Sequence, residues 1–417
     1  MARIWRFESD FMKTQIEKLS KPIVEKVAIV GAGLGGLATA IALRKQGFDV
    51  HVYEKAQEFR PAGAGLGLAP NGLNSLAAIE PGIVESLKSS GCDVRQGIFK
   101  KMTGETLRSN PIRSTYLEKY GQPLITIWWW RLQQILASKL PPETIHLNHR
   151  CVGFEQNDNG VEIYFENGKK VYADLLIGTD GLHSVIRENL IGDGKPHYLG
   201  SMSWRAVIKY NHELLKPDEL VFIKGNKQIM YLLNVGDGYI CWITRKLSSD
   251  FSVSDSATAA KSRVLNELAD WEESVRKLVE ATQAEQILEG PICDRPPLTH
   301  WSKGRVTLLG DAAHPMAPAL GQGANTTFED AYELQQCFSQ SSNIQEALAT
   351  YEKRRIERTQ IIQTRSALGE MRYYEADRET SSSQTQEQSQ TATREEFQDW
   401  LHNYKPFLTD SNPKQFL

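Results

Sequence analysis

The chain has 417 residues and a net charge of -3, and 41% of its residues are hydrophobic while 24% are charged. This length allows two domains or one extended α/β unit, and the charge gives no indication of a basic nucleic-acid surface. No apolar run approaches the roughly 18 residues of a membrane span, so we expect a soluble, cytoplasmic protein. The five cysteines form no CxxC pair, which predicts reduced thiols and no metal site.

The first predicted elements form a dinucleotide-binding unit. Residues 1–22 lack the apolar core of a signal peptide and are predicted to be a tail. Residues 27–30 and 50–53 are predicted strands on either side of a helix at 34–46, and the turn before the helix is GAGLGG, with GxGxxG spacing. Glycines allow phosphate to approach closely, the helix N-terminus attracts it, and the acid that ends the second strand binds ribose. The predicted contacts, to FAD or NAD, are Gly31, Gly33, Leu34, Gly35, Gly36 and Glu54.

The next segment is rich in glycine and then in tryptophan. Residues 58–71 form a predicted loop before a helix that begins near Gly72, and residues 92–127 have the weak alternation and turn signals of short strands. Three consecutive tryptophans at 128–130 precede another helix. Because each indole ring buries a large area, such a run more often packs in a core or domain interface than binds a ligand.

A hairpin and an unusual helix start follow. Residues 151–156 and 161–165 alternate as strands around a turn, and 170–177 is predicted to continue their sheet. Ser184 suits a helix N-cap, but Arg187 stands three residues later, where an acid would complement the helix dipole. This departure indicates a functional cation, with an ion pair to Asp180 as the alternative.

A second sheet is predicted between residues 196 and 290. The strand pattern alternates at 202–210, 220–223, 228–234 and 239–244, and a helical pattern follows at 258–280. Arg205 and Tyr231 are expected on neighbouring strands of this antiparallel sheet, where they can converge on an anionic oxygen. The alternative is a tyrosine packed in the sheet and an arginine at its edge.

The stretch VTLLGDAAHPMAPALGQGANTTFEDA, residues 306–331, has the pattern of a flavin cradle. A buried strand at 306–309 delivers Gly310 and Asp311 to the edge where α/β sheets hold ligands, and the carboxylate can accept hydrogen bonds from a polyol. Prolines and glycines then shape a rigid loop before a helix whose unpaired N–H groups would face the ligand. The alternative is a structural strand, turn and helix rich in small residues.

The C-terminal third is predicted to be helical and then irregular. A helix runs to about residue 340 and a second spans 344–374. Residues 378–396 are of low complexity and are predicted to be mobile, and 397–417 carry aromatics in a polar tail.

Several of these motifs together resemble one family. GDAAH at 310–314, with Pro318, GQG at 321–323 and Asn325, resembles the second flavin motif of the FAD-dependent aromatic hydroxylases, single-component flavoprotein monooxygenases that include salicylate and para-hydroxybenzoate hydroxylases and, more distantly, zeaxanthin epoxidase. The resemblance implies that Arg205 and Tyr231 hold the substrate's phenolate. It also implies FAD contacts at Arg60, Ala64, Arg131, Asp180, Arg187, Gly310, Asp311, Pro318, Gly321, Gly323, Ala324 and Asn325, with Asp180 and Arg187 also serving NAD(P)H.

The family fold implies an α/β protein with a Rossmann-like FAD-binding domain, an antiparallel-sheet substrate layer and C-terminal helices. The predicted FAD-binding domain is discontinuous, over 23–105, 128–195 and 290–345. The substrate domain takes 106–127 and 196–289. The remaining predicted segments are the tail at 1–22, a helix at 346–377, a linker at 378–396 and a tail at 397–417.

The implied function is monooxygenation. NADH or NADPH would reduce non-covalently bound FAD, O2 would form a flavin C4a-hydroperoxide, and one oxygen atom would enter a small aromatic or unsaturated substrate. Two alternatives remain from the sequence: a flavin-dependent reductase or dehydrogenase on the same fold, and a flavin-binding interaction module without catalysis.

Overall fold

A parallel sheet forms the base of the molecule, as expected for an α/β fold. The computed structural model describes residues 24–61, 63–210, 215–372 and 393–406. Apolar runs that are buried on both faces form the central strands, as is typical of parallel sheets. In sheet order the strands are β18 (Ser302–Lys303), β19 (Val306–Leu308), β12 (Leu175–Gly178), β1 (Lys26–Val30), β2 (Asp49–Tyr53) and β8 (Ile145–His146). Only β18 runs antiparallel to its neighbour.

Helices from distant parts of the chain pack together on this sheet. Helix α10 (Gly323–Gln340) contacts α2 (Leu34–Arg44), α3 (Pro70–Ile79) and the long α11 (Ile344–Arg372). The other helices of this part are α4 (Pro81–Ser90), α6 (Trp129–Ala137) and α7 (Val185–Leu190). A hairpin sheet also belongs to it, with β9 (Cys151–Gln156), β10 (Val161–Phe165) and β11 (Lys170–Ala173).

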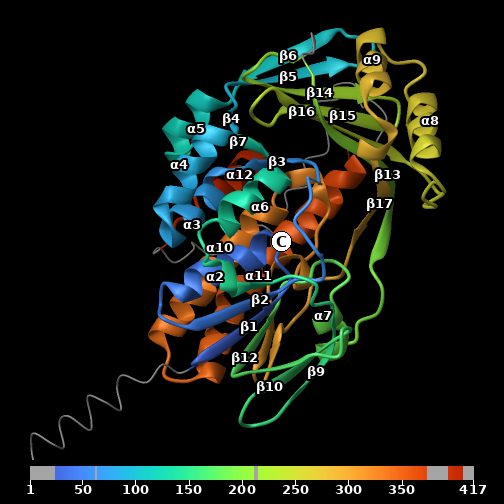
Figure 1. Cartoon of the computed structure of the whole chain (residues 1–417). Coiled ribbons are helices and arrows are strands. Elements are labelled where there is room, and N and C mark those ends of the chain that lie inside the picture. The colour runs from blue at the N-terminus through green and yellow to red at the C-terminus, as the bar shows by residue number, and fades with distance from the viewer. Residues whose placement is uncertain (1–23, 62, 211–214, 373–392, 407–417) are drawn as a thin grey trace, which may run out of the picture.

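A second, seven-stranded sheet forms the other part of the molecule, at the top of Figure 1. Its strands in order are β17 (Leu288–Asp294), β13 (His197–Lys209), β16 (Tyr239–Leu247), β15 (Gln228–Asn234), β14 (Glu219–Gly225), β5 (Gln96–Lys101) and β6 (Thr106–Pro111). The strands from β17 to β14 pair antiparallel, as predicted, and β14 pairs with β5 in parallel.

The two faces of this sheet have different neighbours. Side chains such as Trp204 and Trp242 pack with apolar residues of α8 (Ala257–Glu267) and α9 (Glu273–Ala281) in one core cluster. On the opposite face, Val207, Leu233 and Cys241 pack against Trp128. Trp128 ends β7 (Ile125–Trp128), which pairs with β3 (Gly65–Leu68) and β4 (Cys92–Asp93) in a small sheet. The tryptophan run therefore packs between the two parts, as predicted.

Several predicted boundaries move. Strands β5 and β17 belong to the seven-stranded sheet because they pair with β14 and β13, so the boundaries at 105/106 and 289/290 do not follow the sheet. The boundary at 127/128 falls inside β7 of the small sheet. The expected strand at 170–177 divides between the hairpin sheet and the parallel sheet, and the expected helix at 258–280 divides into α8 and α9.

Part of the C-terminal region that was predicted to be irregular is helical. Helix α12 (Arg394–His402) crosses the predicted boundary at 396/397 and buries Phe397, Trp400 and Leu401. The predicted tail at 1–22 and residues 378–392 lie outside the described residues. Among the described helices, none is long and apolar enough to cross a membrane.

Candidate active site

The glycine loop after β1 folds tightly against the end of β12. Gly31 has a φ of 107°, and a Cβ there would lie 2.5 Å from the carbonyl oxygen of Thr179. A Cβ on Gly36 would lie 1.9 Å from the carbonyl oxygen of Gly31. By contrast, a Cβ on Gly33 would meet nothing within 4 Å. The loop therefore needs glycine at 31 and 36 for its own packing, and Gly33 faces space that a ligand's phosphate can enter.

The N-terminus of α2 is open for an anion. Its N-cap, Gly33, supplies no side-chain cap, and no acidic residue stands in the first turn. Unpaired N–H groups and the positive end of the helix dipole suit a pyrophosphate. Beside it, the Glu54 carboxylate accepts the N–H groups of Ala32 at 2.8 Å and Ala56 at 2.9 Å. These bonds fix the acid next to the loop, with further lone pairs for ribose hydroxyls.

The second predicted motif forms two short turns and an uncapped helix. Gly310–Ala312 and Pro318–Leu320 are 3-10 turns, and Gly310 and Gly321 have φ values of 62° and 63°. A Cβ on Gly323 would meet nothing nearer than the Asp311 Oδ1, at 3.8 Å, so this carboxylate lies beside the first turn of α10. The N-cap of α10, Gln322, makes no side-chain cap. Polyol and flavin groups therefore find an acceptor and a helix N-terminus together.

The two glycine motifs meet through α10. A Cβ on Gly35 would lie 2.6 Å from the Thr327 Cγ2, and one on Gly310 would lie 2.9 Å from the Thr327 Oγ1. The first turn of α2, the turn after β19 and the first turn of α10 are thus adjacent. Part of the Asp311 side chain is exposed to solvent, but protein atoms crowd its carboxylate. The resulting desolvation raises the pKa of Asp311, and His314 opposes this rise.

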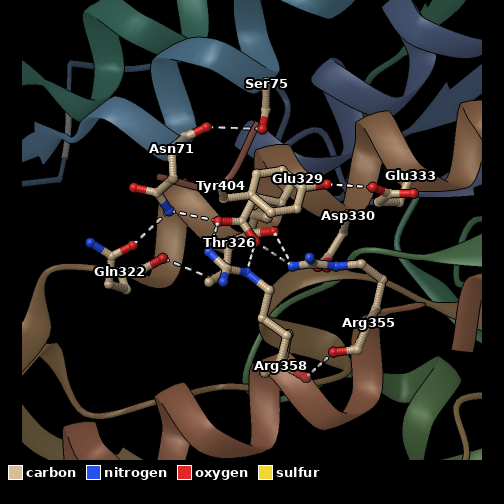
Figure 2. A network of polar contacts seen from close by, with 12 residues as sticks. Asn71, Ser75, Gln322, Thr326, Glu329, Asp330, Glu333, Arg355, Arg358 and Tyr404 are labelled. Carbon is tan, nitrogen blue, oxygen red and sulfur yellow. Dashed lines mark hydrogen bonds and ion pairs between the residues drawn. The ribbon is translucent and has the colours of Figure 1, made fainter. Parts of the chain in front are cut away.

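A buried ionic network lies beneath this motif and was not predicted. Figure 2 shows Arg355 and Arg358 of α11 extending toward Glu329 and Asp330 of α10. Glu329 Oε2 lies 2.7 Å from the Arg358 Nε and 2.9 Å from the Arg355 Nη2, and Asp330 Oδ1 lies 2.7 Å from the Arg355 Nε. Desolvation would raise the pKa of Glu329, but Arg358 and Arg355 outweigh it and hold the pKa below its ordinary value.

The network reaches the candidate flavin loop. The other Asp330 oxygen accepts the N–H of Gly310 at 3.2 Å and pairs with the His314 Nε2. Desolvation would raise the pKa of Asp330, but His314 and Arg355 hold it below its ordinary value. On the other side, the Asn71 amide donates to Gln322 at 2.9 Å and to Glu329 at 2.6 Å. The network therefore holds both the turn that contains Asp311 and Gln322, the residue that precedes α10.

Asn325 has an internal role. Its side-chain oxygen accepts the N–H of Ala69 at 2.9 Å, and its amide nitrogen donates to the carbonyl oxygens of Gly67 at 3.1 Å and Gly321 at 2.9 Å. The side chain thus ties the strand β3 to the glycine loop. A contact between Asn325 and FAD, as predicted, would have to use its backbone.

The contacts of Arg187 are structural and leave no donor for the predicted ligand. Its side chain is 0% exposed, and all five of its N–H donors have partners. Nε and Nη2 bind Asp193, Nη1 donates to the carbonyl oxygens of Ala312 and Ala313, and Nη2 also donates to Pro296. The ion pair is made with Asp193, not with Asp180, which instead caps α7 through Ser184 and two backbone N–H groups. Arg187 therefore positions the candidate flavin loop.

The other two predicted cofactor arginines point elsewhere. Arg60 is 72% exposed and pairs with Glu58 at 2.6 Å. Arg131 Nη1 donates to the carbonyl oxygen of Ser90 at 3.2 Å and pairs with Asp237 at 2.5 Å. Neither prediction of an FAD contact is supported by these contacts.

The sequence pointed to Arg131 on α6, but a different face of this helix, with Trp129 and Gln133, contacts the glycine-rich segments. The Gln133 Nε2 donates to the carbonyl oxygen of Ala32 in the first glycine motif, at 2.8 Å. Trp129, four residues earlier, lies on the same helix face, and its Cβ would be 3.1 Å from a Cβ on Gly63. Arg131 is about 200° around the helix from either residue. This i, i+4 pair was the signal available in the sequence.

Strand β3, which follows the predicted FAD contact Ala64, packs against the seven-stranded sheet. The N–H of Gly65 donates to the Cys241 Sγ at 3.0 Å, and a Cβ on Gly65 would lie 2.8 Å from the Cys241 Cβ. Ala64, a predicted FAD contact, is partly exposed, and its carbonyl oxygen accepts the N–H of Trp129 at 3.0 Å. The predicted cofactor segment therefore lies directly against the predicted substrate layer.

Arg205 and Tyr231 share a face of the sheet but are not on neighbouring strands. Arg205 on β13 and Tyr231 on β15 each stand opposite Ile243 of β16, which lies between them. Two strand spacings separate their backbones by roughly 10 Å. The prediction of neighbouring strands is wrong, because the sheet order is β13, β16, β15 and not the order of the sequence.

Arg205 and Tyr231 each lie near a different predicted flavin-binding segment, β3 for Arg205 and the turn at 318–320 for Tyr231. Cys241, the residue next to Arg205 on that face, contacts Gly65 of β3. The Tyr231 hydroxyl accepts from the Arg245 Nη2 at 2.5 Å, and Arg245 pairs with Glu370 of α11. Next to Glu370, a Cβ on Gly369 would lie 3.2 Å from the Ala319 Cβ in the turn at 318–320.

Arg205 is a cation with no counter-ion in the described part of the chain. Its guanidinium makes no ion pair or hydrogen bond with the described residues, and desolvation lowers its pKa. A cation that is removed from water without a partner is costly, so the site favours an anion beside it.

Arg187→Met should destabilise the fold. Loss of the guanidinium removes the donors to the carbonyl oxygens of Ala312 and Ala313 and leaves Asp193 with Arg295 as its remaining cation, and breaking such a buried pair costs about 3–5 kcal/mol. Urea unfolding should show this loss, whereas the exposed Arg95→Met control should change little. Normal unfolding with a selective loss of flavin reduction by NAD(P)H would restore the ligand role.

Acid should weaken the fold through Glu329 and Asp330. Their pKa values lie below 4.5 and 3.8 respectively, so their stabilisation is complete above about pH 4.5 and is lost as the pH falls through the folded-state values. Urea unfolding between about pH 7 and pH 3 should show this loss. Glu329→Gln should be less stable near neutrality and should vary less with pH; an unchanged pH slope would contradict the assignment.

Comparisons with known proteins agree with this geometry. A family model described as "FAD binding domain" matches residues 25–366. The chain is similar to aurachin C monooxygenase/isomerase from Stigmatella aurantiaca, with 31% identity over 80% of this chain and 85% of that protein. It is also similar to 6-hydroxynicotinate 3-monooxygenase from Bordetella bronchiseptica, with 31% identity over 81% of this chain and 89% of that protein.

A solved structure shows the same fold. HpxO from Klebsiella pneumoniae, complexed with FAD and uric acid, superposes with a TM-score of 0.79 and 26% identity, over 85% of this chain and 90% of that one. The resemblance stated from the motifs is thereby confirmed. The match over most of the chain and the relatives above 30% identity show that this chain belongs to the FAD-dependent monooxygenase family.

Proposed function

We propose that this protein uses NAD(P)H and O2 to hydroxylate a small aromatic substrate that carries an acidic oxygen. The observation that carries the substrate class is Arg205. This desolvated cation has no counter-ion among the described residues, and it lies on the sheet face that adjoins the flavin loops.

The residues present fit non-covalent FAD. The open first turn of α2 and the space beside Gly33 suit the pyrophosphate, and Glu54 suits the adenosine ribose. Asp311 would accept hydrogen bonds from the ribitol. The uncapped first turn of α10 would stabilise negative charge on the pyrimidine side of the ring. When bound, FAD supplies electron transfer from NAD(P)H and the activation of O2.

The protein's own contribution is to hold and orient the substrate. The Arg205 guanidinium would donate charge-assisted hydrogen bonds to a phenolate or carboxylate oxygen. An ionised phenol is more nucleophilic at its ortho and para carbons, so an arginine that favours the anion also favours attack by the ring. Tyr231, fixed by Arg245, would border the same ring. Orientation matters because productive reaction requires the two reacting atoms to be held in contact.

The names of relatives support this substrate class. One relative is named for 6-hydroxynicotinate, a hydroxylated aromatic acid, and HpxO was solved with uric acid. We also propose a cytoplasmic location, which is supported by five free cysteines, the usual state of thiols in that compartment.

Asp311→Ala should weaken FAD retention. Removing one hydrogen-bonded carboxylate costs on the order of 1–3 kcal/mol, or about tenfold in affinity. Titration of the FAD-free protein with FAD measures this, with the exposed Asp270→Ala as the control. Unchanged FAD affinity in a folded Asp311→Ala variant would remove the ribitol role.

Arg205→Met should leave FAD binding intact and lower the fraction of NAD(P)H consumption that yields product. The measurement compares NAD(P)H oxidation with product formation for a phenolic substrate. Tyr231→Phe is expected to have a smaller effect of the same kind, and Arg95→Met none. Full coupling in Arg205→Met, or a neutral polyene as the best substrate, would contradict the assigned anion site.

A further inference from the structure

The row of side chains that carries Arg205 and Tyr231 continues across the outer strands. Tyr231 stands opposite Phe222 of β14, Phe222 opposite Phe99 of β5, and Phe99 opposite Arg108 of β6. With Ile243, these residues form one unbroken row on one face of the sheet, which we call the aromatic row: Arg205, Ile243, Tyr231, Phe222, Phe99 and Arg108.

The rings of the aromatic row are stacked along it. The Phe99 and Phe222 centroids are 4.8 Å apart with an interplanar angle of 6°, which matches the spacing of adjacent strands. Tyr231 meets Phe222 edge-on at 4.9 Å and 71°. The Arg108 guanidinium carbon lies 4.0 Å from the Phe99 centroid and covers the outer end of the stack. Stacked in this way, Phe99 and Phe222 direct ring edges, not faces, away from the sheet.

The aromatic row is more accessible than the rows beside it. On one side, Val207, Cys241, Leu233 and Leu220 stand in register and are buried. On the other side, the inner residues Ser203, Arg245 and Ile229 are buried.

The aromatic row lies between these two buried rows. The four inner members of the aromatic row between Arg205 and Arg108 are only half-buried. The apolar surface is therefore left accessible along a line that begins at the candidate active site. A half-exposed aromatic line of this kind is a usual mark of a binding surface.

We propose that Phe222 and Phe99 form a second subsite that binds the far ring of an elongated substrate with at least three rings in line. This inference rests on the proposed function, with the substrate's acidic oxygen at Arg205. Aromatic ring edges carry positive potential and attract the face of another ring, so an elongated aromatic ligand lying over the aromatic row would meet them favourably. A single ring held at Arg205 would leave Phe222, about 14 Å away in backbone distance, uncovered.

The test uses FAD-loaded protein and two probes of matched charge and functional groups. Salicylate has one ring, and 4-(biphenyl-4-yl)salicylate carries the same hydroxyl and carboxylate on the first of three rings in line, which together are long enough to reach Phe222 from Arg205. Calorimetry gives the Kd of each probe, and NAD(P)H oxidation gives KM and kcat. The variant is Phe99→Leu combined with Phe222→Leu, which keeps apolar side chains on the strands but removes both rings. The matched control is Phe154→Leu, a half-buried strand phenylalanine in the hairpin sheet.

The wild type should bind the three-ring probe about tenfold more tightly than salicylate. The double variant should lose roughly tenfold in affinity for the three-ring probe and less than about twofold in affinity for salicylate. Arg205→Met should weaken both probes, and Phe154→Leu neither. Urea unfolding of each variant separates a binding loss from a folding loss.

Equal affinity of the wild type for both probes would overturn the second subsite, as would an equal loss of both probes in the double variant. The proposed function would stand in either case if a probe still raised NAD(P)H oxidation in an Arg205-dependent manner. Failure of both probes to bind would overturn the inference for hydroxylated aromatic acids. If no phenol stimulates oxidation either, the proposed function fails separately.

Discussion

The ion pairs of Glu329 and Asp330 with Arg355 and Arg358 are the constraint on which the candidate site depends. All four side chains are buried, so the desolvation of each charge is tolerable only while its partners remain. The network joins α10 to α11 and reaches Gly310 through Asp330 and Asn71 through Glu329. Arg358 also donates to the carbonyl oxygen of Leu401, which brings α12 into the same arrangement. The uncapped N-terminus of α10 is thereby held at one position beside Asp311.

Helix α11 connects this network to the substrate face. Arg355 and Arg358 occupy its middle, and Glu370, near its end, pairs with Arg245, which in turn holds the Tyr231 hydroxyl. The turn at 318–320 packs against the same helix beside Gly369. A single rigid element therefore sets both the flavin loop and one border of the aromatic row. Such support matters because catalysis is lost when the reacting groups are displaced by as little as about 1 Å.

Local motifs were predictable, and orientation was not. The first βαβ unit, the strand and helix around Gly310 and the antiparallel substrate layer follow from hydrophobic period and glycine spacing, and the structure contains all of them. Arg187 violates a local helix rule for a structural reason, since its partners are Asp193, just after α7, and the carbonyl oxygens of residues 296, 312 and 313. No local pattern reports such contacts.

Long-range order explains the other differences. The separation of Arg205 from Tyr231 follows from β16 entering the sheet between β13 and β15, which strand patterns alone do not indicate. Arg355 and Arg358 are three residues apart on a charged helix, and such a pair usually marks a solvated face. Only the position of α10 opposite them makes that face buried.

The most direct test of the account is oxygen incorporation. Protein loaded with FAD would turn over a phenolic substrate with NAD(P)H under isotopically heavy O2, and mass spectrometry would locate the label. The account predicts one heavy oxygen atom in the product, and less labelled product per NAD(P)H consumed in Arg205→Met. An oxidised product that contains no heavy oxygen would contradict it and would indicate a dehydrogenase on the same fold.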